Sequence, residues 1–590
     1  MPDIKVIWML VIVTGLLLCL YREWLRPSVA FFVTGAVLVV FGIISPAEAL
    51  HGFANEQLAV IILLLIISDM IRKASAVEAL LARMIGASSN LRVILARLSI
   101  NVSVLSAFFN NTPLVAMMMP FLDGWSKKTG VSPSKVLMPL SFATILGGCV
   151  TLIGTSTNLI VNGLAVEAGY PSLGIFDFAP VGLVMLVIGI LYIVFVGGRL
   201  LPDRKDSRDA FVANSREYFV EAEVQQGSRL VGVSVEDAGL RNLRGLYLIE
   251  VVRQKKTIAP VSPGEILETG DVLIFTGATT AIEELTQPSL GLSLPKACDI
   301  PKEELANVVE VVISHNSNLI GKTIRESNFR GKYDGAILAV HRNGEKLSGK
   351  VGDIEMKAGD ALLVLGGKDF LQRTSNIPVF YVINRLKEHE NVSLWKSLLV
   401  LGGVILSIIL SSIQLVPLFT GLVLVLATAL LIKVVPNQEI RKSIDFELII
   451  MIALGIAFGR AMINSGAAGY LSQTMYQWLN PLGGTLIIFG IFMVTNLLAG
   501  FITTKAAVAL VFPVSVSLAA QMHANPVPFI LVVAFGGAAS FITPIGYQTN
   551  LMVYGPGGYS FKDFFRYGAP LTLIYAVVCA VILAWTYGIE

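Results

Sequence analysis

Charged residues are scarce in this sequence: Asp, Glu, Lys and Arg make up only 14% of its 590 positions, against 54% for hydrophobic residues. A soluble protein of this length needs much more charged surface, so a polytopic membrane protein is the first interpretation. The formal net charge is only +3, which gives no support to nucleic-acid binding. Cysteine is scarce as well. The four cysteines lie far apart without a CxxC pair, which argues against a disulfide or metal framework.

The signatures of enzymes are also missing. The five histidines are scattered singly, mostly in expected loops, so a histidine metal site is not expected. The apolar segments contain no HExxH, no GxSxG and no paired carboxylates, and the charged middle segment has no GxGxxG, P-loop or triad signature. The sequence therefore predicts neither an enzyme nor a bound cofactor.

Long apolar runs, in contrast, are abundant and form two groups. The first covers about 5–20, 28–45, 56–71, 93–121, 136–162 and 180–197, and the second covers about 394–412, 415–433, 446–463, 484–520, 526–552 and 568–587. Each run is about long enough to cross the roughly 30 Å hydrocarbon core of a bilayer. In both groups Asn, Thr, Gly and Pro interrupt the fourth and fifth runs, which is typical of an inverted-repeat transporter.

The positive charges predict opposite orientations for the two groups. Residues 6–20 resemble a signal-peptide core, but arginines rather than a small-residue cleavage site follow, so we expect a retained membrane anchor. Arginine and lysine also follow the third, fourth and sixth runs of the first group. If these charges are cytoplasmic, the fourth run is a hairpin that enters from the cytoplasm, and its counterpart in the second group enters from outside. We therefore expect a multi-pass protein of the plasma (inner) membrane, with both termini outside and residues 203–392 in the cytoplasm.

The charged middle segment contains its own repeat, at a spacing of 89 residues. The stretch RLVGVSVEDAGL (229–240) is matched by NLIGKTIRESNF (318–329), and ETGDVLIFTG (268–277) is matched by KAGDALLVLGG (357–367). The Gly-Asp pair before each aliphatic run predicts a turn followed by a strand. We predict two small α/β modules at 203–298 and 299–392, between membrane repeats at 1–202 and 393–590. The modules resemble the C-terminal (TrkA-C) module of potassium-uptake regulators, which implies either a dimerising insert or a site for a small regulatory ligand.

Two stretches of the first group carry the polar residues expected to do the chemistry. The stretch SAFFNNTPLVAMMMPF (106–121) places Asn110, Asn111 and Thr112 at the tip of the predicted hairpin, and GGCVTLIGTSTNLIVNG (147–163) breaks the next helix before Thr155 and Asn158. Broken backbone is tolerated in a membrane only where it lines a cavity. Carbonyl, Asn and Thr oxygens suit a hard cation such as sodium, whereas helix N-termini suit an anion.

Both stretches recur in the second group. TTKAAVALVFP (503–513) aligns with NNTPLVAMMMP (110–120), so Thr503, Thr504 and Lys505 correspond to the first polar triplet. GGAASFITPIGYQTNLMVYGPGGY (536–559) aligns Ser540 with Thr151, and its TNL follows after a three-residue insertion.

These paired motifs resemble the divalent anion:sodium symporter family, which carries sulfate and di- and tricarboxylates, and the resemblance covers both membrane blocks. It implies a homodimer in which a substrate domain moves as an elevator against a scaffold. The TrkA-C-like insert together with TPIGYQTNLMVYGPGGY resembles the branch of algal and bacterial sulfate transporters, which favours sulfate over a di- or tricarboxylate. The implied anion site consists of Asn110, Asn111, Thr112, Thr503 and Thr504. The implied cation sites include Gly154, Asn158, Thr543 and Asn550, to which we add Thr151 and Thr155.

Lys505 departs from the family pattern, in which a neutral Thr or Asn lies beside a sodium ion. An ammonium group and a sodium ion a few ångströms apart repel strongly in a poorly screened site. We therefore predict that Lys505 is a counter-charge for the substrate, and that fewer sodium ions, or protons instead, are coupled to transport. The alternative is a lysine that extends to the wet outer face.

Two further alternatives remain open at the level of the sequence. Asp69 and Arg460 lie at corresponding places in the two groups, and they are either a gating pair or residues that extend from helix ends. A channel gated by the soluble modules is the alternative to a transporter, but a potassium filter needs a TVGYG-like segment, which PIGYQTN echoes only superficially.

Overall fold

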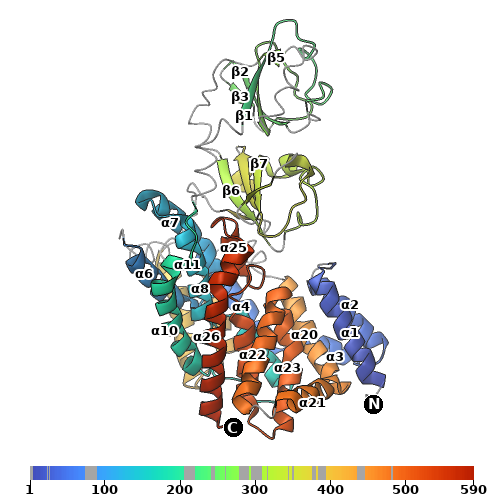
Figure 1. Ribbon diagram of the computed structural model, residues 1–590, viewed down its shortest axis with the longest axis vertical. Coiled ribbons are helices and arrows are strands. Elements are labelled where there is room, and N and C mark those ends of the chain that lie inside the picture. The colour runs from blue at the N-terminus through green and yellow to red at the C-terminus, as the bar shows by residue number, and fades with distance from the viewer. Residues whose placement is uncertain are drawn as a thin grey trace.

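The computed structural model consists of a block of helices and two small β-sheets (Figure 1). All structural statements below concern the described residues, and the predicted module boundaries near 298 and 392 lie outside them. The described residues are 4–22, 24–25, 27–72, 90–204, 219–240, 246–254, 256–258, 261–277, 292–293, 308–314, 317–342, 345–347, 351–367, 369–374, 380–382, 394–432, 434, 446–479 and 483–589.

Helices form wherever the sequence has an apolar run. The first group comprises α1 (Ile4–Tyr21), α2 (Pro27–Val40), α3 (Pro46–His51), η1 (Gly52–Ala54), α4 (Glu56–Arg72), α6 (Leu91–Ser106), α7 (Asn111–Thr129), η2 (Pro133–Lys135), α8 (Leu137–Gly148), α9 (Ser156–Glu167), α10 (Ala179–Tyr192), the π-helical turn η3 (Ile193–Gly197) and α11 (Gly198–Leu200). The fourth and fifth runs are each divided into two helices, as the interrupting Asn, Gly and Thr residues predict, whereas Pro120 lies inside α7.

The second group divides its runs in the same order. It comprises α17 (Leu394–Ser412), α18 (Leu418–Leu431), α20 (Phe446–Asn464), α21 (Ala467–Leu479), α22 (Gly484–Phe501), α23 (Thr504–Gln521), α24 (Pro526–Ala538), α25 (Gln548–Tyr554) and α26 (Phe561–Tyr587). A proline lies inside both α7 and α23, at Pro120 and Pro513.

The helical block has the composition of a membrane-spanning bundle. Among the described residues, five helices are long and apolar enough to cross a membrane, and the number rises to seven if each of two bent helix pairs is one span. The bends are 41° between Pro46–Ala54 and Glu56–Ser68, and 71° between Ile449–Asn464 and Ala467–Trp478. These findings confirm the prediction of a multi-pass membrane protein.

Burial separates outer helices from central ones. Only 22% of α1 is buried, and most of its exposed residues are large and apolar, among them Trp8, Val11 and Leu18. Such an apolar face is stable only against lipid or another protein. In α23, by contrast, 78% of the residues are buried, and every residue of α8 is buried. The interrupted helices therefore form the core of the bundle.

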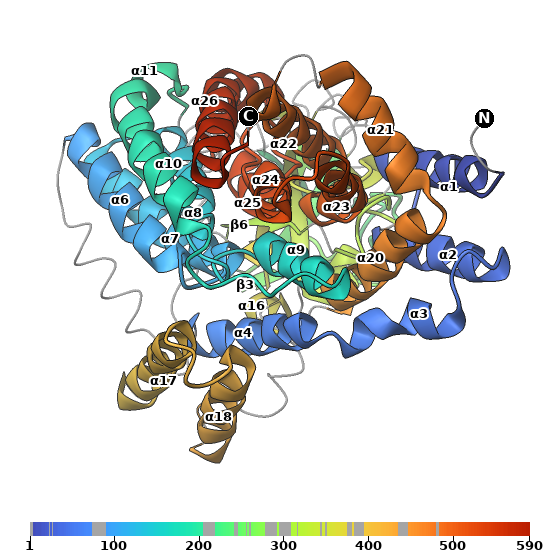
Figure 2. The same cartoon turned by 90° about the horizontal axis from the view of Figure 1, so that it is seen from below.

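The interrupted helices of the two groups interlock. The helix α9 packs against α23 and α24 of the second group, while α25 packs against α7 and α8 of the first. Figure 2 shows these helices together near the middle of the block, with α17 and α18 at its edge. Residues as far as 436 positions apart in the chain are thereby brought into contact.

The middle segment folds as two five-stranded antiparallel sheets. The first has the order β3-β2-β4-β1-β5, and the second has the order β10-β6-β9-β7-β8. The strands are β1 (Phe219–Val224), β2 (Leu246–Arg253), β3 (Lys256–Ile258), β4 (Val272–Gly277), β5 (Leu292–Ser293), β6 (Val308–Ile313), β7 (Gly335–Arg342), β8 (Glu345–Lys346), β9 (Ala361–Gly366) and β10 (Phe380–Val382), with the short helices α15 (Phe329–Tyr333), η6 (Val351–Asp353) and α16 (Phe370–Thr374) in the second. β6 begins 89 positions after β1, β7 begins 89 after β2, and β9 begins 89 after β4.

An internal ion pair recurs at the same spacing. Arg253 donates two hydrogen bonds to Asp271, both of 2.8 Å, and Arg342 donates two to Asp360, both of 2.7 Å. The hydrogen bonds to Asp360 raise the pKa of Arg342. Each aspartate follows the glycine of its Gly-Asp turn and is almost fully buried. The turn that the sequence predicts is therefore held to the neighbouring strand by a bidentate contact.

The sheets lie at one end of the helical block. In Figure 1 the sheet of β6–β10 lies between the helices and the first sheet, and both chain ends lie at the opposite end of the block. Arg330, at α15, donates hydrogen bonds to the carbonyls of Val261 and Leu248 in the first module, so the two modules touch.

Candidate functional site

The first candidate element is the turn between α6 and α7. The side chain of Asn110 caps α7 by accepting a hydrogen bond from the amide of Thr112, at 3.3 Å. Asn111 is buried, and its Oδ1 accepts a hydrogen bond from the hydroxyl of Ser106. Its Nδ2 donates to the hydroxyl of Tyr547 at 2.8 Å. The polar triplet therefore does form a tip, and one of its side chains reaches the other half of the chain.

The second tip has the same construction. Only Ile502 and Thr503 connect α22 to α23, and the two helices pack side by side, so the chain reverses direction there. Thr503 caps α23 by accepting a hydrogen bond from the amide of Ala506 at 3.2 Å. Thr504 is buried and Lys505 is partly buried, both in the first turn of the helix. All three residues predicted for this half of the anion site thus lie at one helix N-terminus.

The first broken helix is held together by side chains at its break. The hydroxyl of Thr151 accepts from the amide of Gly154 at 3.1 Å and donates to the carbonyl of Ala107. Asn158 Nδ2 donates to the carbonyls of Thr151 at 2.9 Å and Gly148 at 3.4 Å. A Cβ atom on Gly154 would lie 2.6 Å from the Gly148 carbonyl, so only glycine permits this approach.

The second broken helix repeats this network. The hydroxyl of Thr543 accepts from the amide of Gly546 and donates to the carbonyl of Gly500, both at 3.0 Å. Asn550 Nδ2 donates to the carbonyls of Ser540 at 2.8 Å and Thr543 at 3.2 Å. The structural counterpart of Thr151 is therefore Thr543. The alignment of Thr151 with Ser540 was wrong, because the three extra residues of the second half come before this threonine and not after it.

The two asparagines differ in one respect. Asn550 Oδ1 accepts a hydrogen bond from Ser141 of α8 at 2.7 Å. No hydrogen-bond donor among the described residues reaches Asn158 Oδ1, although the residue is fully buried. A buried carbonyl oxygen without a donor costs free energy unless it binds something. The first break therefore leaves a buried oxygen without a donor among the described residues, whereas the protein satisfies the equivalent atom at the second break.

Two residues at the start of α25 join the elements. The Tyr547 hydroxyl lies 2.7 Å from the hydroxyl of Thr155 as well as 2.8 Å from Asn111 Nδ2. The next residue, Gln548, accepts a hydrogen bond from Thr112 at 2.9 Å. Thr155 therefore faces Tyr547 rather than the network around Asn158. The start of α25 connects the first tip to the first broken helix.

A small pocket opens beside the first tip. It is bounded by residues of α4 on one side, and by the tip and the first broken helix on the other. Its lining includes Ser68, Asn110 and Ser156 among mainly aliphatic side chains. Asn110 thus faces a space between the central helices and α4, whereas Asn111 faces Tyr547.

An ion-pair cluster lies at the far end of α9. Arg460 of α20 lies 3.0 Å from one carboxylate oxygen of Glu167, and His51 lies 3.1 Å from the other. Glu167 is largely buried, with 11% of its side chain exposed. Arg460 is therefore tied to α9, and the side chain of Asp69, its predicted partner, lies outside the described residues.

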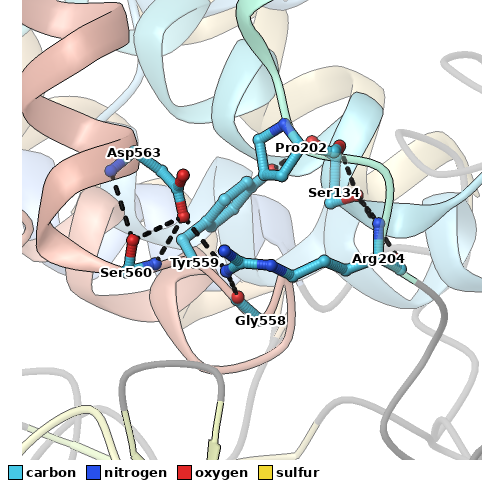
Figure 3. Close-up of polar contacts among 7 residues, drawn as sticks. All are labelled: Ser134, Pro202, Arg204, Gly558, Tyr559, Ser560 and Asp563. Atoms are coloured by element: carbon cyan, nitrogen blue, oxygen red, sulfur yellow. Dashed lines mark hydrogen bonds and ion pairs between the residues drawn. The ribbon is translucent and has the colours of Figure 1, made fainter.

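A polar cluster fixes the loop between α25 and α26 (Figure 3). The Tyr559 hydroxyl donates to the carbonyl of Ser134 at 2.7 Å, and Arg204 lies 3.0 Å from Asp563 and also donates to the carbonyl of Gly558. Arg204 is the last described residue before β1. The chain that leads to the modules is thereby attached to the loop that follows the second broken helix.

Sequence reasoning missed several of these residues. Tyr547 precedes the TNL motif of the second half by two positions, and Thr155 precedes that of the first half by two. An alignment of the two TNL motifs would therefore have shown that Tyr547 corresponds to Thr155. Ser141 and Glu167 carry no comparable signal, because their partners Asn550 and Arg460 are remote in sequence.

Comparison with known proteins agrees with this architecture. The family model described as citrate transporter (CitMHS) matches residues 8–496 and 415–589. A Chlamydomonas reinhardtii protein provisionally named as a sulfur deprivation response regulator is 34% identical over 94% of this chain and 97% of its own length. The uncharacterized transporter sll0640 of Synechocystis is 30% identical over 100% of this chain and 98% of its own. Sodium/sulfate cotransporter 1 of C. reinhardtii is 22% identical, over 95% of this chain and 88% of its own.

The matches extend across both helical groups, and the relatives are named mainly as transporters. They confirm the resemblance to anion:sodium symporters and the prediction that the chain is not an enzyme. The chain belongs to the citrate transporter family and is a membrane transporter.

Proposed function

We propose that the chain is a secondary active transporter that carries a small divalent anion, with sulfate favoured, across the plasma membrane together with sodium or protons. The observation that supports this best is the interlocked pair of tips and broken helices. The first turns of α9 and α23 both border Gly537, whose Cβ position is 3.1 Å from Thr157 and 3.7 Å from the Thr504 carbonyl. Helix N-termini with Asn and Thr side chains suit an oxyanion. The names of the sodium/sulfate cotransporter relatives support the choice of substrate.

The coupling cation belongs, in this proposal, at the first break. The Asn158 side-chain oxygen is buried without a donor, and the carbonyls around it come from broken backbone. Carbonyls of unwound backbone coordinate sodium in transporters built from broken helices. At the second break the equivalent oxygen, Asn550 Oδ1, already accepts a hydrogen bond from Ser141. Lys505 lies at the neighbouring tip. We infer one cation site at Thr151, Gly154 and Asn158, and a second site, around Thr543 and Asn550, that is altered.

The proposal includes the mode of movement. The residue-for-residue match between the two hydrogen-bond networks supports a pair of inverted repeats. Helices α6–α10 and α22–α26 would form the moving substrate domain, and α1–α4 with α17–α21 the scaffold. The Arg460–Glu167 ion pair crosses this boundary, so it has to break during transport. A homodimer stays a prediction from the family resemblance.

Uptake into proteoliposomes tests the function. With the full-length chain we expect saturable uptake of labelled sulfate that stops when both the sodium and the proton gradient are dissipated. Uptake of succinate or citrate without sulfate would instead establish a di- or tricarboxylate transporter. An ionic conductance without saturable uptake would establish the gated channel.

We also propose that the cytoplasmic modules, which we identify as TrkA-C-like, regulate transport through α25. The turn before β9 lies against that helix: a Cβ atom on Gly359 would lie 2.6 Å from Leu551, which follows Asn550 directly. Gly555, at the end of α25, is equally close to the turn, with its Cβ position 3.0 Å from the Gly359 carbonyl. A small ligand that shifts the second sheet would therefore move the helix that carries Thr549 and Asn550.

A pair of glycine substitutions tests this contact. Gly359 and Gly270 occupy the same position in the two repeats and have φ angles of +82° and +83°. Alanine strains the backbone equally at both, but Gly270 has no atoms within 4 Å of its Cβ position. We expect Gly359→Ala to lower the maximal uptake rate by about fivefold or more, the scale of a modest coupling energy. Gly270→Ala should leave the rate close to that of the unchanged protein, and equal effects of both substitutions would refute the contact's regulatory role.

A further inference from the structure

Tyr547 occupies the point at which the two halves of the candidate site meet. It is the residue before α25, with extended backbone angles of φ −141° and ψ 139°, and Thr155 precedes α9 with nearly the same angles, −139° and 144°. Neither side chain caps its own helix. Instead the two hydroxyls lie 2.7 Å apart. The residues at matching positions of the two broken helices therefore contact each other directly.

The hydrogen bond from Asn111 indicates where the proton of Tyr547 is directed. The Nδ2 group of Asn111 faces Tyr547 and donates to its oxygen at 2.8 Å. The phenolic oxygen is thus an acceptor toward Asn111, and its own proton is directed elsewhere. In this structure Thr155 is the neighbour that can receive it.

We infer that Tyr547 determines anion specificity by donating its phenolic hydrogen bond to an oxygen of the bound oxyanion. This inference rests on the proposed function. An arriving anionic oxygen competes with the neutral hydroxyl of Thr155 for the proton, and the charged acceptor forms the stronger bond. The bond from Asn111 is kept during this exchange, so the donor is positioned before the anion binds.

The inference predicts the class of anion. Sulfate is fully deprotonated at neutral pH and presents only acceptor oxygens, whereas hydrogen phosphate of similar shape carries a hydroxyl donor. Hydrogen phosphate can still accept this bond through its other oxygens, but its hydroxyl needs an acceptor, and each group that faces the anion as a donor removes one place where that hydroxyl could be satisfied. A phenol with its proton directed into the site is one such donor. Tyr547 should therefore contribute to a preference for sulfate over phosphate.

Removal of one hydroxyl tests this role. In proteoliposomes, Tyr547→Phe is expected to raise the KM for sulfate by about tenfold to a hundredfold, the range for a lost hydrogen bond to a charged group. The maximal rate should change much less. The ratio of the inhibition constant of phosphate to the KM for sulfate should also fall, because the preference for sulfate is weakened. In the purified full-length protein the rise in Tm caused by added sulfate should be lost.

Tyr192→Phe is the matched control, because the hydroxyl of Tyr192 also donates a buried hydrogen bond, to the carbonyl of Tyr567 at 2.7 Å. It should lower the Tm without sulfate but leave the sulfate-induced rise and the KM unchanged. A Tyr547→Phe variant that behaves like this control would overturn the inference and leave a structural role. If the unchanged protein neither binds nor transports sulfate, the proposed function fails first, and the Tyr547 inference fails with it.

Discussion

Replacement of Lys505 by alanine is expected to raise the KM for the anion by about tenfold to a hundredfold, because a hydrogen bond to a charged group contributes about 1.5–3 kcal/mol. Lys505 lies in the first turn of α23, at the positive end of an 18-residue helix. The helix dipole disfavours a cation at this end, and a bound anion would offset that cost. The same place is poor for sodium, since two unit charges about 4 Å apart repel by roughly 4 kcal/mol at an effective dielectric constant of 20. Labelled-sulfate binding and uptake in proteoliposomes measure the effect.

The control for Lys505 is Lys562→Ala, which removes an exposed positive charge at the start of α26. It should change the KM little. A second variant tests the cation: Lys505→Asn together with Ser141→Ala removes the repelling charge and frees Asn550 Oδ1. We expect a steeper sodium dependence of the remaining uptake. Normal affinity in Lys505→Ala, with unchanged cation dependence in the double variant, would show that the lysine only extends to the outer face.

The second large effect is expected from Asn158→Ala, with Asn550→Ala as its counterpart. Each substitution removes two hydrogen bonds to broken backbone, which costs about 1–3 kcal/mol for each carbonyl left unpaired. Asn550→Ala also removes the hydrogen bond from Ser141, so it should lower stability at least as much as Asn158→Ala. Only Asn158 carries a buried side-chain oxygen that no described donor reaches. The sodium or proton concentration for half-maximal uptake should therefore rise by about tenfold or more in Asn158→Ala, and much less in Asn550→Ala. Equal shifts in cation dependence for Asn158→Ala and Asn550→Ala would contradict the assignment of a single site.

The sequence by itself determined the features that depend on local composition. Apolar runs predicted where helices form, because burial in lipid requires about 20 apolar residues in a continuous segment. Asn, Gly and Thr at the interruptions predicted the tips and the breaks. The Gly-Asp turns and the spacing of 89 residues predicted the matching strands of the two sheets. Each of these signals lies within a short stretch of chain.

The tertiary structure decided everything that depends on contacts between distant residues. Tyr547 was not predicted as part of the site, because its partners Asn111 and Thr155 are 436 and 392 positions away. The difference between Asn158 and Asn550 depends on whether α8 or α24 supplies a hydroxyl, which no local pattern reveals. The ion pair of Arg460 with Glu167 was likewise not predicted, because the two residues are remote in sequence. A hydrogen bond requires two atoms within about 3 Å, and only the packing of the two interlocked helix groups determines which atoms those are.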